Sequence, residues 1–446
     1  MKNKLYLCSV KFLERLILIL MAEKIYKKRI ADQLLAERLE EVGAVLVEGP
    51  KWCGKTTTAL QQSNSKVMLA NPEELQKSKI LIATDASRLL SGETPKLFDE
   101  WQTIPELWDN IRYEVDSRNA EGQFILTGSA VPITSDKIVH SGTGRFAWVT
   151  MRPMSLWESE ESTGEVSLQA LFDGQLQIQG ENTHTLEDIA FMLCRGGWPS
   201  SLNRSPRAAL RVARDYYDAV VKTDFIRVDG TLRNQTRSRM LLRSLARLQG
   251  TQTAISVIRQ DMLANDESSL AENTVASYIE ALRNIFVVED MPAWSTNLRS
   301  KTVIRTSPTR YFVDPSIAVA ALGITPAELL DDMQTFGFLF EAMAIRDLRV
   351  YADALDAKVY HYRDKDELEC DAVIELRNGR YALVEIKIGG MVNILTAAKQ
   401  LQKLAKKINT DRVGEPAFCM VLTAVGDEAY QLEDGTLVVP IGCLKH

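Results

Sequence analysis

The sequence predicts an α/β fold, because short apolar runs typical of buried parallel strands alternate with amphipathic stretches typical of helices. Three of these runs lead into polar residues suited to chemistry: VLVEGPKWCGKTTT at 45–58, LFDE at 97–100 and FILTGS at 124–129. The first run has the order strand, glycine loop, helix opening, and the third run is expected beside it in the sheet. The chain is therefore predicted to begin with a parallel sheet covered by helices.

Length and composition indicate a globular protein of several domains. At 446 residues the chain exceeds the size of one hydrophobic core, so two to four domains are expected. The net charge of −6 gives no global basic field for nucleic acid, although a local basic face is compatible with it. Six scattered cysteines without a C-x-x-C pair indicate reduced thiols in a cytoplasm rather than a zinc site or disulfides.

The first residues resemble a signal peptide only in part. The apolar run at 13–21 follows several lysines, but Glu14 and Arg15 interrupt it and no A-x-A site follows. The run is too short to span a bilayer as a helix, so no membrane partner is predicted. Residues 1–24 are treated as an extension, and Met21 is an alternative translation start.

The glycine loop matches the pattern G-x-x-x-x-G-K-[ST]. Backbone N–H groups of such a loop and the following helix N-terminus face a phosphate. The lysine reaches the β- and γ-phosphates and the next hydroxyl ligates Mg²⁺, whereas the alternative is a chance glycine turn ahead of a helix. The residues predicted to contact ATP are Gly49, Pro50, Lys51, Trp52, Cys53, Gly54, Lys55, Thr56 and Thr57.

Two further strand ends are predicted to complete this site. Asp99 would hold Mg²⁺ through water, and Glu100 would orient and deprotonate the attacking water. The alternative is an exposed acid pair at the start of a helix. Thr127 and Ser129, at the tip of the strand beside the loop, are predicted to sense the γ-phosphate.

Two residues carry more specific hypotheses. Arg145, in the loop SGTGRF, is predicted to reach the nucleotide of a neighbouring subunit as an arginine finger, which requires a homo-oligomer. The alternative is a surface arginine paired with an acid. The Cys53 thiol lies near a helix N-terminus and is predicted to be reactive, with a buried and inert thiol as the alternative.

Several motifs in fixed order resemble a known family. VLVEGPKWCGKTTTA, LFDEWQ, FILTGSA and GRFAWVTMRPMSLWE are similar to segments of a prokaryotic family of AAA-type ATPases with a C-terminal domain of unknown function. The similarity continues through RGGWPS, the Asp224-Phe225 pair, YFVDPSIA and VEIKIG. The resemblance implies an AAA-type P-loop ATPase domain at residues 25–155 that binds ATP with Mg²⁺.

The middle of the chain is predicted to be helical. Residues 156–235 form a helical connector, and residues 236–295 have the outline of a winged helix, with a short strand at 286–288 after a helix. A helix followed by a β-wing occurs in many DNA-binding proteins. The helix at 272–284 exposes Glu272, Glu280 and Arg283, however, so its charge favours a structural linker over DNA reading.

In residues 296–446 a helix carries Glu341, and Asn378-Gly379 favours a tight hairpin between ECDAVIEL and RYALVEIKIG. An acid on the helix, an acid on the first hairpin strand and E-x-K on the second resemble the PD-(D/E)xK nuclease fold. The resemblance implies that Asp371 and Glu385 bind a divalent metal with support from Glu341, and that Lys387 stabilises charge or positions water. The alternatives are a nuclease-like fold that does not cut, or a structural network of ion pairs.

A later helix carries four lysines near one face. Lys399, Lys403, Lys406 and Lys407 are suited to steering a phosphate backbone, with an ordinary solvated face as the alternative. The whole sequence predicts a Mg²⁺-dependent ATPase coupled to a nuclease-like or partner-binding C-terminal domain. The alternatives are an ATP-gated DNA endonuclease and a nucleotide-switched interaction protein with negligible turnover. ATP, DNA and a second copy of the chain are the predicted partners, and a protein partner is unidentified.

Overall fold

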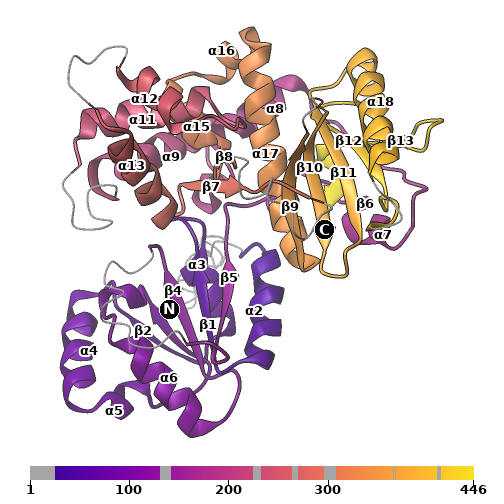
Figure 1. Ribbon diagram of the computed structural model, residues 1–446. Helices are drawn as coiled ribbons and strands as arrows, with labels where there is room; N and C mark the ends of the chain where they lie inside the picture. Colours follow the sequence, from indigo (N-terminus) through magenta and orange to yellow (C-terminus); the bar gives the residue numbers. More distant parts are fainter. Residues whose placement is uncertain are drawn as a thin grey trace, which may run out of the picture.

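The computed structural model describes residues 26–130, 142–224, 233–263, 270–295, 308–364, 366, 368–408 and 413–446. The predicted extension at 1–24 and Phe225 lie outside these ranges. Figure 1 shows the N-terminal sheet domain below a larger body, in which a helical region on one side and a second sheet on the other flank the long helix α17. Within the described ranges, no helix is both long and apolar enough to cross a membrane.

The N-terminal domain is the predicted parallel sheet. Its strand order is β2-β3-β4-β1-β5, and every pairing is parallel. Side chains alternate between two apolar cores, so that Leu46 and Phe98 face one side and Val45 and Leu97 face the other. The elements are α2 (Ile30–Glu41), β1 (Ala44–Glu48), α3 (Lys55–Gln62), β2 (Ser65–Met68), α4 (Pro72–Thr84), α5 (Ala86–Leu90), β3 (Lys96–Asp99), η1 (Trp101–Thr103), α6 (Leu107–Arg118), β4 (Phe124–Gly128) and β5 (Phe146–Thr150).

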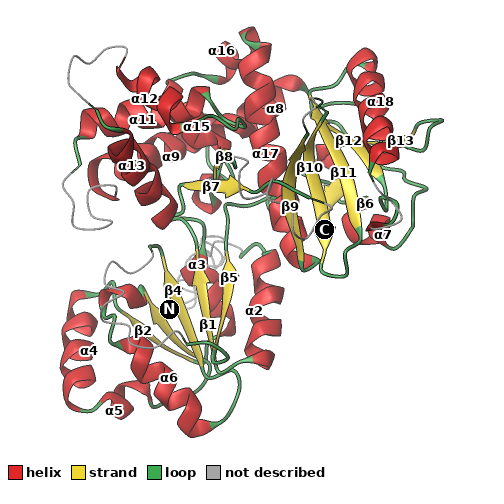
Figure 2. Ribbon diagram, viewed as in Figure 1, coloured by secondary structure: helices red, strands yellow, loops and turns green. Residues whose placement is uncertain are grey.

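A helical region follows, packed above the carboxyl edge of this sheet (Figures 1 and 2). Amphipathic helices bury apolar faces such as Val212, Tyr216 and Leu241 in a common core. The connector begins with β6 (Val166–Ser167) and α7 (Leu168–Phe172), which lie beside the second sheet (Figure 1). The helical elements and the hairpin that follow are α8 (Leu186–Arg195), η3 (Pro199–Ser201), α9 (Pro206–Ala219), η4 (Val220–Asp224), α11 (Gln235–Arg247), α12 (Ile255–Leu263), α13 (Glu272–Asn284), β7 (Val288–Met291), β8 (Thr309–Phe312), α15 (Pro315–Leu322) and α16 (Pro326–Asp331).

The strand after α13 differs from the prediction. It begins at Val288 rather than at residue 286, because Phe286 adopts a left-handed conformation with φ 56°. Strand β7 pairs antiparallel with β8, from Val288–Phe312 to Met291–Thr309. The predicted domain boundary at residue 295 therefore falls inside this hairpin.

The C-terminal sheet has the order β13-β14-β12-β11-β10-β9. The predicted hairpin is present: β10 and β11 pair antiparallel, and Gly379 supplies the positive φ of 83° that the turn requires. The elements are α17 (Met333–Ala354), β9 (Ala357–Arg363), β10 (Glu369–Leu376), β11 (Tyr381–Lys387), α18 (Met391–Lys407), β12 (Cys419–Thr423), β13 (Tyr430–Gln431), β14 (Leu437–Pro440), η5 (Ile441–Cys443) and β15 (Leu444–Lys445).

One hydrophobic core joins the connector, the helical region and one face of the C-terminal sheet. Strand β15 pairs with β6 of the connector. Arg346 of α17 forms fully buried ion pairs with Asp314 and Asp347. These two carboxylates also bind the connector, since Asp347 accepts from the Leu156 N–H and Asp314 from the Gly197 N–H, each at 2.9 Å. Residues 156–446 therefore share one core across the predicted boundaries.

Candidate functional site

The P-loop occupies the carboxyl edge of the N-terminal sheet, between β1 and α3. Gly49 has φ 148°, and a Cβ there would lie 2.0 Å from the Met151 carbonyl oxygen, so a side chain cannot fit. Gly54 begins α3 in a left-handed conformation. The Lys55 ammonium is buried inside the loop, where it donates to the carbonyls of Gly49 at 2.8 Å and Pro50 at 2.7 Å.

Hydroxyl groups from two other elements converge on Asp99. Thr56 Oγ1 donates to Asp99 Oδ1 at 2.6 Å, and Thr127 Oγ1 donates to the same oxygen at 2.7 Å. Strand β4 lies between β1 and β3, and it places Thr127 opposite both Val47 and Asp99. The structure thus brings the predicted lysine, threonines and first acid together at one edge.

Glu100 lies beside this group in a left-handed conformation with φ 59°. Its backbone N–H donates to Thr127 Oγ1 at 3.2 Å, and Ser129 Oγ donates to its carboxylate at 3.0 Å. Gln102, which sequence reasoning missed, also donates to this carboxylate. Three neighbours therefore hold Glu100 at the end of β3.

The other loop residues differ in exposure. Lys51, Trp52 and Thr57 are exposed, whereas the Cys53 thiol is buried and donates to the Met151 carbonyl at 3.4 Å. This geometry favours the buried alternative for Cys53 over a reactive thiol. The Trp52 ring lies edge-on to Tyr216 of α9, with 5.6 Å between ring centroids, so the loop touches the helical region.

Arg145 lies at the opposite edge of the sheet from the P-loop. It precedes β5, and its carbonyl accepts from Ala44 at the start of β1. Five strand residues separate the two edges, roughly 16 Å. Its guanidinium pairs with Asp116 at 2.8 Å on the surface, as in the alternative interpretation. Within one chain Arg145 cannot serve the P-loop, and a role toward a neighbouring subunit stays a prediction.

Arg29 is a loop-supporting residue that the sequence did not reveal. It is buried at the start of α2 and donates to the carbonyls of Cys53 and Arg152, each at 2.8 Å. Its Nε lies 3.0 Å from Glu158 in a buried ion pair. No local motif marks such a residue, because its partners are 24 to 129 positions away in the chain.

The C-terminal residues predicted to act together also lie together. Lys387 Nζ donates to Asp371 at 3.1 Å and to Glu385 at 2.7 Å. The Ile386 N–H donates to Asp371 at 2.7 Å. Tyr311 of β8 donates to Glu341 of α17 at 2.6 Å, so the helical region contributes to this cluster.

The cluster is crowded with carboxylates of unusual pKa. Burial, and then the charge of Asp371, raise the pKa of both Glu341 and Glu385 to about 8. Burial opposes the charge of Lys387, but Asp371 and Glu385 outweigh it and raise the pKa of the ammonium. Across the described ranges, no group of three or more His, Cys, Asp or Glu is arranged to hold a metal ion.

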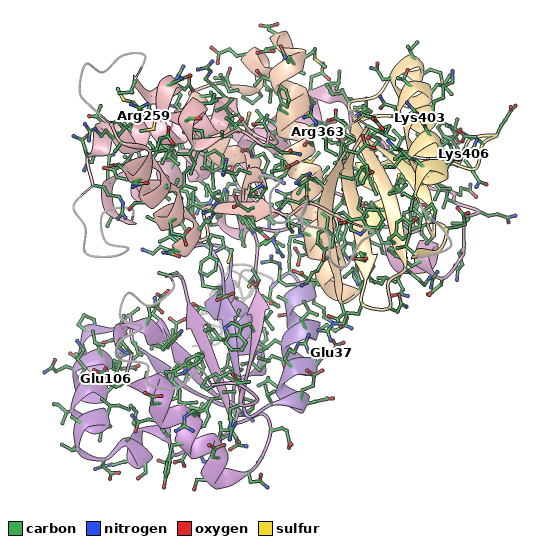
Figure 3. All side chains as sticks on the ribbon, viewed as in Figure 1. Glu37, Glu106, Arg259, Arg363, Lys403 and Lys406 are labelled. Carbon is green, nitrogen blue, oxygen red and sulfur yellow. The ribbon has the colours of Figure 1, made fainter. Side chains whose placement is uncertain are left out.

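The four lysines of α18 differ in whether a carboxylate neutralises them. Lys407 pairs with Asp364 and Asp366, each at 2.6 Å. Lys403 and Lys406 lie exposed on the outer side of the helix (Figure 3).

Family comparisons match three stretches of the chain. A model described as an AAA domain matches residues 41–160. Domains of unknown function, DUF8612 and DUF4143, match residues 186–328 and 336–444. The first match and the geometry of the loop support an AAA-type P-loop ATPase. The C-terminal match leaves the nuclease resemblance a prediction.

Two curated relatives are uncharacterized proteins, Mb2031c of Mycobacterium bovis and Rv2008c of Mycobacterium tuberculosis. Each is 23% identical over 416 residues, which cover 93% of this chain and 83% of the relative. Among solved structures, a Walker-type ATPase of Pyrococcus abyssi is 18% identical, with a TM-score of 0.41, and covers 67% of this chain and 97% of its own. The Orc1 protein of Aeropyrum pernix in complex with DNA is 14% identical, with a TM-score of 0.24. The match covers 68% of this chain and 95% of the Orc1 chain.

Proposed function

We propose that this protein is a Mg²⁺-dependent ATPase that couples ATP hydrolysis to its C-terminal domain. The observation that carries the proposal is the convergence of Lys55, Thr56, Asp99 and Thr127 at one edge of a parallel sheet. Phosphate-binding loops are found at this edge, where backbone N–H groups and a helix N-terminus point outward.

The residues at this edge fit ATP and Mg²⁺ chemically. A threonine hydroxyl and an aspartate carboxylate are oxygen ligands of the kind that Mg²⁺ prefers, and a buried ammonium suits phosphate. Bound Mg²⁺ neutralises charge on the phosphates. Thr56 and Asp99 would hold the ion, and Lys55 would hold the phosphate oxygens.

Glu100 is the proposed general base. Its carboxylate lies next to Asp99 in sequence but is oriented separately, by Ser129 and Gln102. It would accept a proton from the water that attacks the γ-phosphate. Thr127 holds both acids in register, since it donates to Asp99 and accepts from the backbone of Glu100.

Steady-state phosphate release by the full chain with ATP and Mg²⁺ tests the proposal. Lys55→Ala should abolish ATP binding and release together. Glu100→Gln should keep ATP binding and lose release, since the amide cannot accept the proton. Wild-type turnover by Glu100→Gln would refute the assigned base. ATP binding without release by the wild-type chain would instead favour a nucleotide-switched interaction protein.

A second candidate function is nucleic-acid cleavage by the C-terminal domain. It is favoured by Lys387 between Asp371 and Glu385, and by Glu385 Oε1, which is buried without a hydrogen-bond partner among the described residues. Incubating plasmid DNA with the full chain and Mg²⁺ or Mn²⁺ tests it. Cleavage should vanish in both Asp371→Ala and Lys387→Ala. An uncut plasmid would identify the cluster as a structural ion network.

We also propose a cytoplasmic location. The cysteines in the described ranges are all free and buried, which suits a reducing compartment.

A further inference from the structure

Residues 203–247 are strongly basic in an acidic chain. This segment contains 11 Lys and Arg against four Asp and Glu, although the whole chain has a net charge of −6. The segment covers α9 and α11 of the helical region, whereas the helix first considered for DNA contact was α13. The charge is therefore concentrated on α9, outside the predicted winged-helix module, and on α11, at the start of that module.

On α9 the arginines form one exposed stripe. Arg207, Arg211 and Arg214 are exposed and follow each other at steps of four and three residues, which places them on one side of a helix. The opposite side is buried through Val212 and Tyr216.

A second stripe runs along α11. Arg239, Arg243 and Arg247 are exposed and lie four residues apart, so they also share one helix side. Leu241 and Leu245 on the other side of α11 are buried in the core.

The two stripes meet at the end of α9. Arg239 lies 3.5 Å from Asp218, and its guanidinium stands over the Tyr217 ring at 5.8 Å. Arg243 donates to the Leu322 carbonyl at 3.3 Å, which fixes it at the end of α15. We call the six arginines of α9 and α11 the arginine face.

Acids neutralise this face only in part. Asp218 and Asp261 pair with Arg239 and Arg247, and Asp215 and Glu328 are also near. For Arg207, Arg211 and Arg214, the described part of the chain provides no salt bridge within 4.0 Å. The α9 stripe thus keeps its positive charge toward solvent.

We propose that the arginine face binds the phosphate backbone of duplex DNA. Guanidinium groups match phosphate oxygens in pairs, and contacts to phosphates position a protein without reading sequence. Arg207 and Arg214 are about 10 Å apart along α9, a length over which duplex DNA presents about six phosphate charges. This proposal rests on the proposed function only in taking DNA as the partner. It places the contact with the phosphate backbone on α9 and α11 rather than on the lysines of α18.

Fluorescence anisotropy with a labelled 20-base-pair duplex, measured over a range of salt concentrations, tests this on the full chain. The triple variant R207Q/R211Q/R214Q should bind about tenfold more weakly or worse at low salt. Its slope of log affinity against log salt should be shallower by about 3, one unit for each lost contact. The Arg→Lys triple variant should keep most of the slope, which separates lost charge from lost folding.

The matched control is K399Q/K403Q/K406Q, which removes three exposed charges from α18 and should leave the slope unchanged. An unchanged slope in the α9 variant, or a reduced slope in the α18 control, would overturn the proposal. No duplex binding by the wild type, or binding to anionic vesicles or polyglutamate alone, would also overturn it. Phosphate release is measured in parallel without DNA, so failure of the ATPase proposal is distinguishable from failure of this one.

Discussion

At the scale of single residues, Thr127 connects the two acids. Its hydroxyl donates to Asp99 and accepts from the backbone N–H of Glu100, so one side chain sets the distance between the proposed metal ligand and the proposed base. Both hydrogen bonds are buried or half-buried, where a lost partner costs most.

Thr127→Val tests this connection, since valine keeps the shape of threonine without its hydroxyl. We expect ATP hydrolysis to slow by about tenfold or more, because a hydrogen bond to a charged group is worth about 1.5 to 3 kcal/mol. Phosphate release measures the loss, and Thr127→Ser should restore most of it. Equal rates for the valine and serine variants would show that the hydroxyl has no role.

His361 provides a test of pH dependence. Burial lowers the pKa of His361 to about 4, and the Gln252 side chain donates to its Nδ1 at 3.0 Å. As pH falls from about 6.5 toward 4, the imidazole of His361 binds a proton in the unfolded chain but stays neutral in the folded chain. The free energy of unfolding therefore decreases.

Between pH 7 and pH 5 we expect a loss on the order of 1 to 2 kcal/mol from this group. Thermal melts of the wild type and of His361→Gln measure it. The melting temperature of the variant should fall less over the same pH interval. An identical fall in both proteins would remove His361 as the cause.

At the scale of elements, the sequence predicted those whose signals are local. Alternating and continuous apolar runs identified β1, β4, β10 and β11, and Asn378-Gly379 identified the hairpin turn. The acid and lysine cluster on that hairpin followed from strand alternation. Arg29 could not be predicted in this way, because its role depends on where the chain folds back onto the loop. Gln102 could not either, because its bond to Glu100 depends on the left-handed backbone of Glu100, which no apolar periodicity marks.

Arg29 links the start of α2 to the P-loop through its hydrogen bond to the Cys53 carbonyl. Arg29→Met should weaken ATP binding by about tenfold, since it frees the carbonyl of Cys53, and should lower the melting temperature. Removing one partner of a buried ion pair costs about 3 to 5 kcal/mol, because the other charge stays buried.

The double variant Arg29→Met with Glu158→Gln separates these effects. Removing the unpaired charge should recover part of the melting temperature but not the ATP affinity. Lys28→Ala, at the exposed neighbour of Arg29, is the control and should change neither. Full recovery of ATP binding in the double variant would show that Arg29 acts on stability alone.

At the scale of the whole molecule, long-range contacts cross the predicted domain boundaries. Arg152, after the AAA-type sheet, pairs with Glu289 of β7 at 2.6 Å and also with Asp353 of α17. The shared core and the pairing of β6 with β15 join residues that no local pattern relates. Composition and periodicity indicate where elements are, but not which distant elements share a core.

A fragment of residues 310–446 is therefore expected not to fold. It keeps β9 to β15 but lacks β6, which pairs with β15, and α7, whose Phe172 ring packs against Phe418 with 5.1 Å between ring centroids. Circular dichroism and proteolysis of this fragment, beside a fragment of residues 156–446, measure the difference. Cooperative melting of the shorter fragment would show that the C-terminal sheet is an independent domain.

Assembly is the second prediction at this scale. If Arg145 serves a neighbouring subunit, phosphate release per chain should rise with protein concentration, and Arg145→Ala should bind ATP but turn over slowly. Asp116→Ala, which removes its surface partner, is the matched control and should not slow turnover. Activity that is independent of concentration in a monomer would leave Arg145 as a surface ion pair.

The pairing of the connector with the C-terminal strand β15 has a consequence for synthesis in the cell. Ser162 donates to the carbonyl of Leu444, 282 residues later. At a translation rate of about 5 to 20 residues per second, the partner of the connector emerges roughly 15 to 60 s afterward. During that delay the apolar side chains of α7, among them Leu171 and Phe172, have no sheet to cover them. The yield of soluble protein should therefore depend on elongation speed and on chaperones that hold nascent chains.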